Sequence, residues 1–414
     1  MSGFLLIRSN RPIDYIDIVF DKIKKHILPP NFLLQELESH SYDLYLVWHP
    51  RGVVTWKKDR DTDSIIISTS GEFPDLSKGI VDGVRKMKGH FTVAILSDKQ
   101  MRLATDISCT SPVYYAIEET GGSFLFSTVP WVPKCKSIPR FRPLSSALAG
   151  GYYYDSSDEN SVKSWLPENP PTKSPHFSRD LLNNMSSSGL IAMLGRILLR
   201  EPQKKTCILC SGGFGSSSLA TISKKNNLLL PLVCFGNKTK ETADTDSYTK
   251  LCQFLNNGEH FIRDNSSGKM EDVNKRSSAV ASLLGCSLET ASELQIFDWL
   301  ANEVAKNYER VIMGIGYDSS FSPNVRESAN ATQGERAVLI KIFESKGLQV
   351  ICPYLDRDVV CFMETVPQEI RTQHPPAFCL RRDMQKKNML SSELAWRYRI
   401  SYSKTLDIAG RPSS

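Results

Sequence analysis

The sequence predicts an α/β protein in which an α+β sandwich of antiparallel sheets is followed by a doubly wound parallel sheet. Three observations support this fold class. The chain has 414 residues, which is more than one hydrophobic core usually holds. The first part consists of short apolar or alternating runs, and the later part alternates strand-like and helix-like runs. We therefore expect two domains with different sheet types.

The runs before residue 150 are rich in β-branched and aromatic residues, which favour strands. Turn residues such as Asp98 and Gly121-Gly122 separate them. Close succession of short strands indicates layered antiparallel sheets. The predicted strands are "YDLYLVWH" (42–49), "SIIIST" (64–69), "HFTVAILSD" (90–98), "QMRLATD" (100–106), "SPVYYAIEE" (111–119) and "SFLFSTV" (123–129).

A change of composition marks the predicted domain boundary. The stretch "GGYYYDSSDENSVKSWLPENPPTKSP" (150–175) is rich in Gly, Ser, Pro and acidic residues. Such a composition is typical of loops and linkers. We predict a first domain over residues 1–150, a linker over 151–180 and a second domain over 181–414.

After the predicted linker, strand and helix patterns alternate, which implies a parallel sheet with helices on both faces. No internal repeat is visible. Helices are predicted over 185–200, 217–226, 244–257, 291–308, 334–347 and 388–402, and strands over 205–210, 228–236, 310–316 and 348–356.

Composition narrows the class of protein. The net charge of +6 is spread along the chain, so no nucleic-acid partner is indicated. No apolar run reaches the roughly 20 residues that span a bilayer, and the start "MSGFLLIRSN" has no basic leader. We expect a cytoplasmic protein with no membrane partner. Cys207 and Cys210 form one C-x-x-C, which leaves a redox or zinc protein open as an alternative, although no second ligand pair accompanies it.

The stretch "CILCSGGFGSSSLA" (207–220) joins a predicted strand to a predicted helix through Ser211, Gly212 and Gly213. Ligands of parallel sheets lie beyond the carboxyl ends of the strands. Glycines let backbone N–H groups approach an anion, and the start of the helix favours negative charge. The hydroxyls of Ser211 and Ser216 can add hydrogen bonds. We therefore expect a phosphate-binding loop.

This loop resembles the pyrophosphate loop S-G-G-x-D-S of ATP pyrophosphatases, above all that of asparagine synthetases. "RVIMGIGYDSSFS" (310–322) is similar to the G-x-G-x-D-E of that family, with Gly314, Gly316 and Asp318 as the matching residues. "ICPYLDRDVVCFMETVP" (351–367) is similar to the family's R-x-P-F-L-D, which precedes a helix. The resemblance implies that the second domain has the ATP pyrophosphatase fold.

The first half of the chain resembles class II glutamine amidotransferases, which have the N-terminal nucleophile fold. The match runs from Gly89 to Pro130, and Arg51-Gly52-Val53 matches the family's R-G-V. An amidotransferase followed by a synthetase is the arrangement of asparagine synthetases. The shorter, more divergent asparagine synthetase domain-containing branch fits best.

The resemblance also implies that the glutaminase half is inactive. The family uses an N-terminal cysteine activated by its own amino group, and the residue at that position is Ser2. The family's N-G-E is Ser70-Gly71-Glu72, so one oxyanion donor is missing, a loss that typically costs about 100-fold or more. Arg51 matches the arginine that holds the substrate carboxylate.

For the second half, the resemblance implies ATP-dependent amidation of aspartate through a β-aspartyl-AMP. ATP, aspartate and ammonia or glutamine would be the small-molecule partners. Of the two aspartates that help hold Mg²⁺ in the family, Asp318 is present, and Gly215 stands at the position of the other. Ser319 replaces the glutamate after Asp318, and the late catalytic lysine of the family falls at Lys404.

These residues are compatible with two functions. One is an asparagine synthetase-like ligase that uses free ammonia. The other is a pseudoenzyme that binds nucleotide and acts as a regulatory or scaffold protein. If the first is right, the Gly215→Asp substitution should raise the affinity for Mg-ATP.

Overall fold

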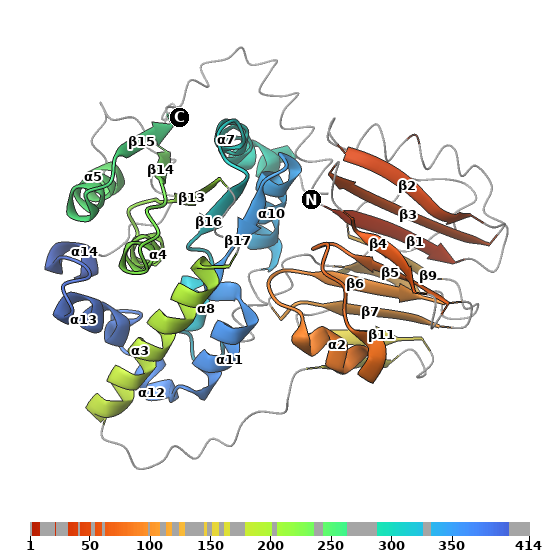
Figure 1. Ribbon diagram of the computed structural model, residues 1–414, viewed down its shortest axis with the longest axis horizontal. Coiled ribbons are helices and arrows are strands. Elements are labelled where there is room, and N and C mark those ends of the chain that lie inside the picture. The colour runs from red at the N-terminus through yellow and green to blue at the C-terminus, as the bar shows by residue number, and fades with distance from the viewer. Residues whose placement is uncertain are drawn as a thin grey trace.

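The computed structural model of the protein describes residues 2–8, 21, 32–39, 42–50, 54–59, 63–97, 100–107, 113–117, 124–128, 145–146, 151–156, 161–165, 179–200, 205–235, 243–262, 288–325 and 333–396. The strands of these residues form two antiparallel sheets and one parallel sheet, which confirms the predicted sheet types. Figure 1 shows the antiparallel sheets on one side of the molecule and the parallel sheet with its helices on the other.

In the first sheet every pairing is antiparallel, and the strand at its centre is one that the sequence does not predict. Strand β1 has an almost continuously buried run, because apolar neighbours cover both of its faces. Such a strand lacks the alternation that reveals a half-buried strand. In sheet order, the strands are β10 (Ser145–Ser146), β8 (Tyr114–Ile117), β9 (Phe124–Ser127), β1 (Gly3–Arg8), β3 (Asp43–Pro50) and β2 (Phe32–Ser39).

The second sheet is also antiparallel, and it contains two strands from the range where the sequence predicts a linker. Strands β11 and β12 extend it beyond β7, so residues 152–155 and 161–164 are sheet and not linker. The Ser and Lys content of β12 reflects its position at the edge of the sheet. In sheet order, the strands are β12 (Ser161–Ser164), β11 (Tyr152–Asp155), β7 (Met101–Thr105), β6 (Thr92–Leu96), β5 (Ser64–Ser68) and β4 (Trp56–Asp59).

The two antiparallel sheets pack face to face through one cluster of buried side chains. Phe4, Val47 and Phe126 of the first sheet meet Ile67 and Leu103 of the second. On its other face the second sheet carries the short helices η1 (Leu76–Lys78) and α2 (Ile80–Lys86). This is the sandwich that the alternating runs predict.

The parallel sheet has the order β15-β14-β13-β16-β17, so the chain starts in the middle and adds strands first on one side and then on the other. Its strands are β13 (Thr206–Leu209), β14 (Leu232–Phe235), β15 (Glu259–Ile262), β16 (Arg310–Met313) and β17 (Gln349–Ile351). The accompanying helices are α3 (Arg179–Leu198), α4 (Phe214–Lys225), α5 (Ala243–Leu255), α7 (Leu288–Ala305), α8 (Tyr317–Ser320), α10 (Gln333–Ser345), η2 (Pro353–Leu355), α11 (Arg357–Thr365), α12 (Gln368–Arg371), α13 (Phe378–Lys386) and α14 (Ser392–Trp396).

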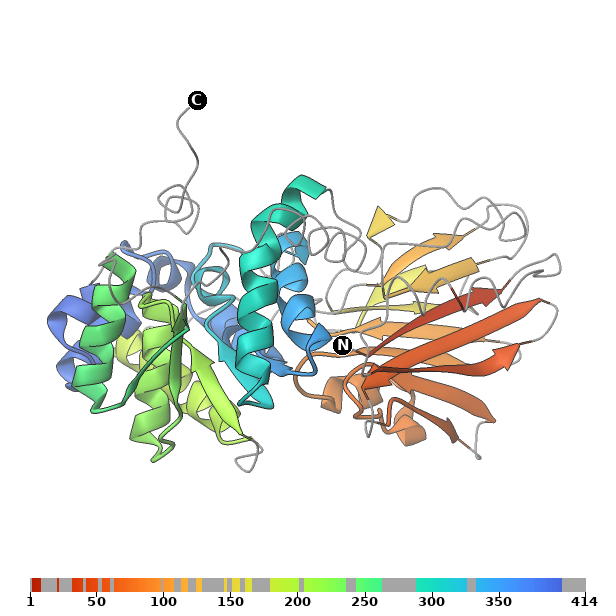
Figure 2. The same cartoon turned by 90° about the horizontal axis from the view of Figure 1, so that it is seen from above.

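Helices cover both faces of the parallel sheet, as predicted. Alternate residues along β13 belong to different buried clusters: Cys207 packs with α7 and α10, and Ile208 packs with α4 and α5. Successive side chains of a strand point to opposite faces, which explains this division. Figure 2 shows α7 and α10 between the parallel sheet and the antiparallel sheets.

One buried cluster runs from the antiparallel part into the parallel part. It includes Val84 and Phe91 from the first part and Tyr354 and Val359 from the second. The backbone amide of Cys352 donates to Nε2 of His90 at 3.2 Å, beside the edge strand β17. Arg357 also donates to the carbonyl of Met87 at 3.2 Å. Among the described helices, none is long and apolar enough to cross a membrane.

Candidate functional site

The strand order of the parallel sheet changes direction between β13 and β16, which lie side by side at its centre. From β13 the chain continues through α4 to β14 on one side, and from β16 it continues to β17 on the other. The loops that leave the carboxyl ends of these neighbouring strands therefore diverge. Open α/β sheets bind ligands in the crevice at such a switch point. The two predicted glycine motifs lie on these two loops.

The first loop leaves β13 and leads directly into α4. Gly212 has φ +72°, a left-handed conformation that favours glycine, and Gly213 caps the helix. The amides of Phe214, Gly215 and Ser216 are in the first turn of α4 and have no acceptor within the helix. Helix starts of this kind attract anions. The loop is thus shaped as the sequence predicts.

The hydroxyls of this loop are used differently from the expectation. Ser216 donates to the carbonyl of Gly213 at 3.1 Å, and its oxygen lies 3.6 Å from the sulfur of Cys210. Ser216 is therefore part of the loop's internal bonding. Ser211 is only partly buried, so its side chain is the more accessible of the two. Backbone amides, rather than Ser216, are the main anion donors that the loop offers.

The second loop leaves β16 and touches the first. A Cβ on Gly314 would lie 2.7 Å from the backbone nitrogen of Ser216, a distance that real side chains do not tolerate. Gly316 has φ +88°, and a Cβ there would lie 2.3 Å from the Leu355 side chain. Gly314 is therefore required for the two loops to approach each other, and Gly316 is required for the second loop to pack against Leu355 of η2. The structure brings together all six residues predicted to bind the pyrophosphate of ATP on these two loops.

The predicted metal position is only half present. Asp318 lies in the first turn of α8, exposed to solvent and without a hydrogen-bond partner among the described side chains. A Cβ on Gly215 would lie 3.0 Å from Cβ of Tyr317 and 3.1 Å from the carbonyl oxygen of Gly314. A side chain that supplied a second carboxylate there would therefore be crowded and would need its neighbours to shift by a few tenths of an ångström. Within the described residues, no group of three His, Cys, Asp or Glu side chains could hold a metal ion.

A cluster of buried side chains packs against the two loops on the core side. No sequence pattern predicts this cluster. Arg381 of α13 lies over the ring of Phe214 at 4.2 Å and donates to the hydroxyl of Tyr317 at 3.1 Å. Tyr354 shares a 2.6 Å hydrogen bond with Ser218, which donates to the carbonyl of Gly215 at 2.8 Å. These contacts join α13 and η2 to the first turn of α4.

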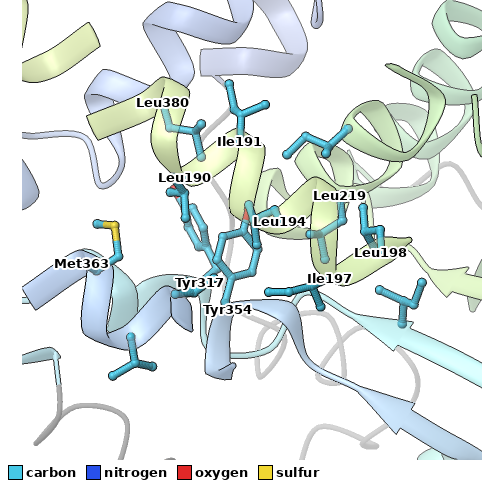
Figure 3. Close-up of a cluster of buried hydrophobic side chains, with 14 of the residues drawn as sticks. Leu190, Ile191, Leu194, Ile197, Leu198, Leu219, Tyr317, Tyr354, Met363 and Leu380 are labelled. Carbon is cyan, nitrogen blue, oxygen red and sulfur yellow. The ribbon is translucent and has the colours of Figure 1, made fainter. Parts of the chain in front are cut away.

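The tyrosines of this cluster belong to the hydrophobic core. Figure 3 shows Tyr317 and Tyr354 among apolar side chains of α3 and α4, including Leu194 and Leu219. Burial raises the pKa of Tyr317, and the nearby guanidinium of Arg381 offsets part of that rise. Burial likewise raises the pKa of Tyr354. Both phenols therefore stay protonated at neutral pH, and their role is to hold the loops in place.

The residues of the predicted glutaminase site lie in the antiparallel part. Ser2 precedes β1 and is 7% exposed. Gly71 has φ +80°, but its amide donates to the carbonyl of Ser68 at 3.4 Å. The hydroxyl of Ser70 accepts from the amide of Glu72 at 3.2 Å and lies 3.1 Å from the Ser68 hydroxyl. The Gly71 amide, which is the remaining expected oxyanion donor, is thus engaged within its own turn, and the Ser70 hydroxyl bonds within the same turn. Arg51 and Lys404 lie outside the described residues.

The C-x-x-C does not form a site. Cys207 packs on the α7 and α10 face of the sheet, and Cys210 packs on the α4 face. The two sulfurs therefore cannot share a metal ion or form a disulfide. Burial raises the pKa of the Cys207 thiol to about 12 and also raises that of Cys210. The redox or zinc alternative is wrong for this pair.

A scan against protein-family models found no match, and a search of curated proteins found none. Among solved structures, the chain is similar to the glutamine phosphoribosylpyrophosphate amidotransferase from B. subtilis complexed with ADP and GMP. The TM-score is 0.28 and the identity 10%, over 59% of this chain and 70% of that one. It is also similar to a structure described as the allosteric regulatory enzyme of purine biosynthesis. That TM-score is 0.29 and the identity 8%, over 72% and 91% of the two chains. With TM-scores this low, neither likeness bears on what this chain does.

Proposed function

We propose that this chain is an asparagine synthetase-like protein that binds ATP at the switch point of its parallel sheet. The observation that carries the proposal is the contact between the two glycine turns, where Gly314 lies against Ser216. Such a close approach of two backbones leaves N–H groups, and few side chains, facing the crevice. Backbone amides at a helix start are a common phosphate cradle.

The amides of α4 would hold the pyrophosphate part of the nucleotide. These amides are preorganised, because Ser218, Tyr354 and Arg381 contact the first turn of α4 from the core side. Donors that need no rearrangement stabilise developing charge more effectively than mobile ones. This preorganisation supports a role in releasing pyrophosphate, the leaving group when ATP activates a carboxylate.

Mg²⁺ fits this site only with the protein supplying one carboxylate. Asp318 is exposed and could reach a hydrated ion, and Mg²⁺ often takes only one or two carboxylates and keeps several waters. When bound with ATP, the ion would neutralise charge on the phosphate oxygens. Gly215 adds no ligand, and a Cβ at that position would crowd Cβ of Tyr317 at 3.0 Å.

The proposed reaction is ATP-dependent amidation of aspartate with free ammonia as the nitrogen source. The engaged amide of Gly71 and the engaged hydroxyl of Ser70 support this choice over glutamine. In that reaction the aspartate carboxylate attacks the α-phosphate of ATP, pyrophosphate leaves, and ammonia then displaces AMP from the acyl group. Lys404 keeps its proposed role as a charge-stabilising lysine, and Arg51 is a remnant of the glutamine site.

A second candidate function has its own supporting observation. The crowding of the Gly215 position by Tyr317 favours a protein that binds nucleotide without turning it over. Such a pseudoenzyme would act as a regulatory or scaffold protein. The two candidates share the nucleotide site and differ only in chemistry.

A pyrophosphate-release assay separates the candidates. Purified full-length protein would receive ATP, Mg²⁺ and aspartate, with ammonium or glutamine as the nitrogen source. We expect ammonium-dependent release of pyrophosphate and none that depends on glutamine. Turnover with glutamine would contradict the inactive glutaminase half, and ATP binding without turnover from either source would establish the pseudoenzyme.

A further inference from the structure

His90, in the bend before β6, covers an edge of the parallel sheet. Strand β17 is the end strand of the described part of that sheet, on the side that faces the antiparallel sheets in Figure 1. The amide of Gln349 donates towards β16, to the carbonyl of Glu309 at 2.9 Å. Successive amides of a strand point to opposite sides, so the amide of Cys352 points to the open edge. There it donates to Nε2 of His90 at 3.2 Å.

This hydrogen bond requires an imidazole that has no proton on Nε2. A backbone amide can only donate, so Nε2 of His90 accepts, and the proton of the neutral ring is on Nδ1. Nδ1 is buried and has no hydrogen-bond partner among the described residues. Protonation of the ring would place a second N–H against the amide of Cys352. The contact therefore exists only while His90 is neutral.

Charged groups of both signs lie around this imidazole. On α10, the carboxyl of Glu344 interacts electrostatically with His90, Lys341 and Asp106. Asp106, which follows β7, accepts from the amide of Phe91 at 3.3 Å. A nearby carboxylate favours a protonated imidazole, whereas the ammonium of Lys341 opposes it. Glu344 is thus an alternative partner that becomes favourable when His90 is charged.

Two further cations lie on neighbouring segments. Arg357, at the start of α11, donates to the carbonyl of Met87 at 3.2 Å and to Asp358 at 3.0 Å. Lys88 is exposed and interacts with the same carboxylate of Asp358. Both cations therefore have an acidic partner on α11, whereas His90 interacts with Glu344 of α10.

The Cys352 amide begins the segment that supports the two loops of the switch point. The carbonyl of Cys352 accepts from the amide of Leu355 at 2.9 Å, within η2. The side chain of Leu355 packs so closely on Gly316 that a Cβ there would lie 2.3 Å away. Tyr354 shares a 2.6 Å hydrogen bond with Ser218 of α4. The contact at the sheet edge therefore connects the antiparallel part to the support of both loops.

We propose that His90 is a proton-sensitive latch between the antiparallel part and η2. Neutral His90 accepts from the Cys352 amide and holds the start of η2. Protonated His90 releases this amide and donates to the carboxyl of Glu344 instead. Histidine is the side chain whose charge ordinarily changes between about pH 5 and 8, so mild acid opens the latch. The inference involves no nucleotide and no reaction, so it does not rest on the proposed function.

Labelling with ¹⁵N-cysteine provides a direct reporter at the latch. The chain has ten cysteines, so NMR can resolve the amide of Cys352 and assign it by its loss in Cys352→Ala. Hydrogen exchange in the full-length protein then measures the protection of this amide between about pH 5 and 8, corrected for the intrinsic exchange rate. The amide of Cys210 is the internal control, because it donates to the carbonyl of Val233 at 2.8 Å rather than to a histidine.

The wild type and two substitutions of His90 give different profiles. In wild type, we expect protection of the Cys352 amide relative to Cys210 to fall by about threefold to tenfold from about pH 7.5 to 5.5, because one hydrogen bond is lost. His90→Gln places an acceptor oxygen near the position of Nε2 and does not titrate, so its relative protection should be high and constant. His90→Phe offers no acceptor, so its relative protection should be low and constant.

Two further variants test the partners of the latch. His260→Gln is the matched control, because His260 lies 3.3 Å from the hydroxyl of Tyr308 within the parallel part. It should keep the wild-type profile. Glu344→Gln removes the carboxylate that favours protonated His90, so it should move the fall in protection to lower pH.

Three outcomes would overturn the proposal. One is a wild-type profile as constant as that of His90→Gln. Another is the same pH response in His90→Gln as in wild type, which would show that a different group titrates. The third is a fall in protection that Glu344→Gln leaves at the same pH or moves to higher pH. If His90→Phe does not fold, the comparison of wild type with His90→Gln decides.

Discussion

Gly215 and Tyr317 face each other across the two loops of the switch point, so closely that a side chain at position 215 would need its neighbours to shift by a few tenths of an ångström. A Cβ on Gly215 would lie 3.0 Å from Cβ of Tyr317. The ring of Tyr317 packs against Phe214 at 5.5 Å and Tyr354 at 5.6 Å, so it has little freedom to move away. A side chain at position 215 would therefore strain the contact with Tyr317.

The close contact between Gly215 and Tyr317 determines the expected effect of the Gly215→Asp substitution on stability and on ATP binding. We expect Gly215→Asp alone to lower the free energy of unfolding by about 1–3 kcal/mol, because it overpacks the contact with Tyr317. It should not raise the affinity for Mg-ATP. Urea unfolding and calorimetric titration with ATP, with and without Mg²⁺, would measure the two effects.

The double variant Gly215→Asp with Tyr317→Gly supplies the control. Compared with Tyr317→Gly alone, the added aspartate no longer meets Cβ and Cγ of residue 317, so it should strengthen the Mg²⁺ dependence of ATP binding. Residues in direct contact give non-additive effects of about 0.5–3 kcal/mol, so a double-mutant cycle should show coupling. Additive effects in this cycle would mean that Tyr317 does not close the position.

Arg381 should be important for stability although it is far from the loops in sequence. It is 6% exposed, lies over Phe214, and donates to Tyr317 and to the carbonyl of Pro376 at 2.8 Å. We expect Arg381→Met to lower the free energy of unfolding by about 3 kcal/mol, because several charge-assisted hydrogen bonds are lost. Urea denaturation measures this change.

The neighbouring Arg382 is a suitable comparison. It is less buried than Arg381 and lies 5.7 Å from the ring centre of Phe378. Arg382→Met should cost about 1 kcal/mol or less, as expected for a partly exposed cation over a ring. Equal costs for the two variants would argue against a special role for Arg381 under the loops.

The sequence predicted the sheet types and both glycine turns, because strands, turns and helix starts are local patterns. It did not predict β1, whose side chains are buried on both faces, or the strands β11 and β12, whose composition is that of a loop. Nor could it reveal Arg381, because the contact with Phe214 joins residues far apart in sequence. The closure of Gly215 by Tyr317 likewise needs the positions of both loops.

Glu344 should make stability depend on pH. Burial raises its pKa above the ordinary value of 4.5, and the nearby charge of Lys341 offsets part of the rise. The folded chain then binds more protons than the unfolded chain, so wild-type stability falls as pH rises through and above that value. We expect Glu344→Gln to unfold at a higher temperature than wild type at pH 7.5.

The gain in Glu344→Gln should vanish near pH 4, where the wild-type carboxyl is largely protonated in both states. Glu303→Gln is the control, since Glu303 forms a surface pair with Lys306. Its effect should be small at all pH values. Thermal unfolding of the three proteins from pH 4 to 8 provides the comparison, and a destabilised Glu344→Gln at pH 7.5 would contradict the sign.

The buried thiols should be inert in the native protein. Cys207 and Cys210 lie on opposite faces of the parallel sheet, and burial raises the pKa of both. We expect neither to react with a thiol reagent until the protein unfolds, and the purified protein to retain no zinc through this pair. Labelling followed by mass spectrometry, together with elemental analysis, tests this. Rapid native labelling of either residue would show that the pair is accessible.

ATP titration of wild type, Gly314→Ala and Gly258→Ala tests the central claim most directly. A methyl group on Gly314 would meet the backbone of Ser216 at 2.7 Å, whereas one on Gly258 would meet nothing within 4 Å. The account predicts that wild type and Gly258→Ala bind ATP equally, and that folded Gly314→Ala binds at least about tenfold more weakly, a change of about 1.4 kcal/mol. Equal ATP affinity in all three proteins, or no binding by wild type, would contradict it.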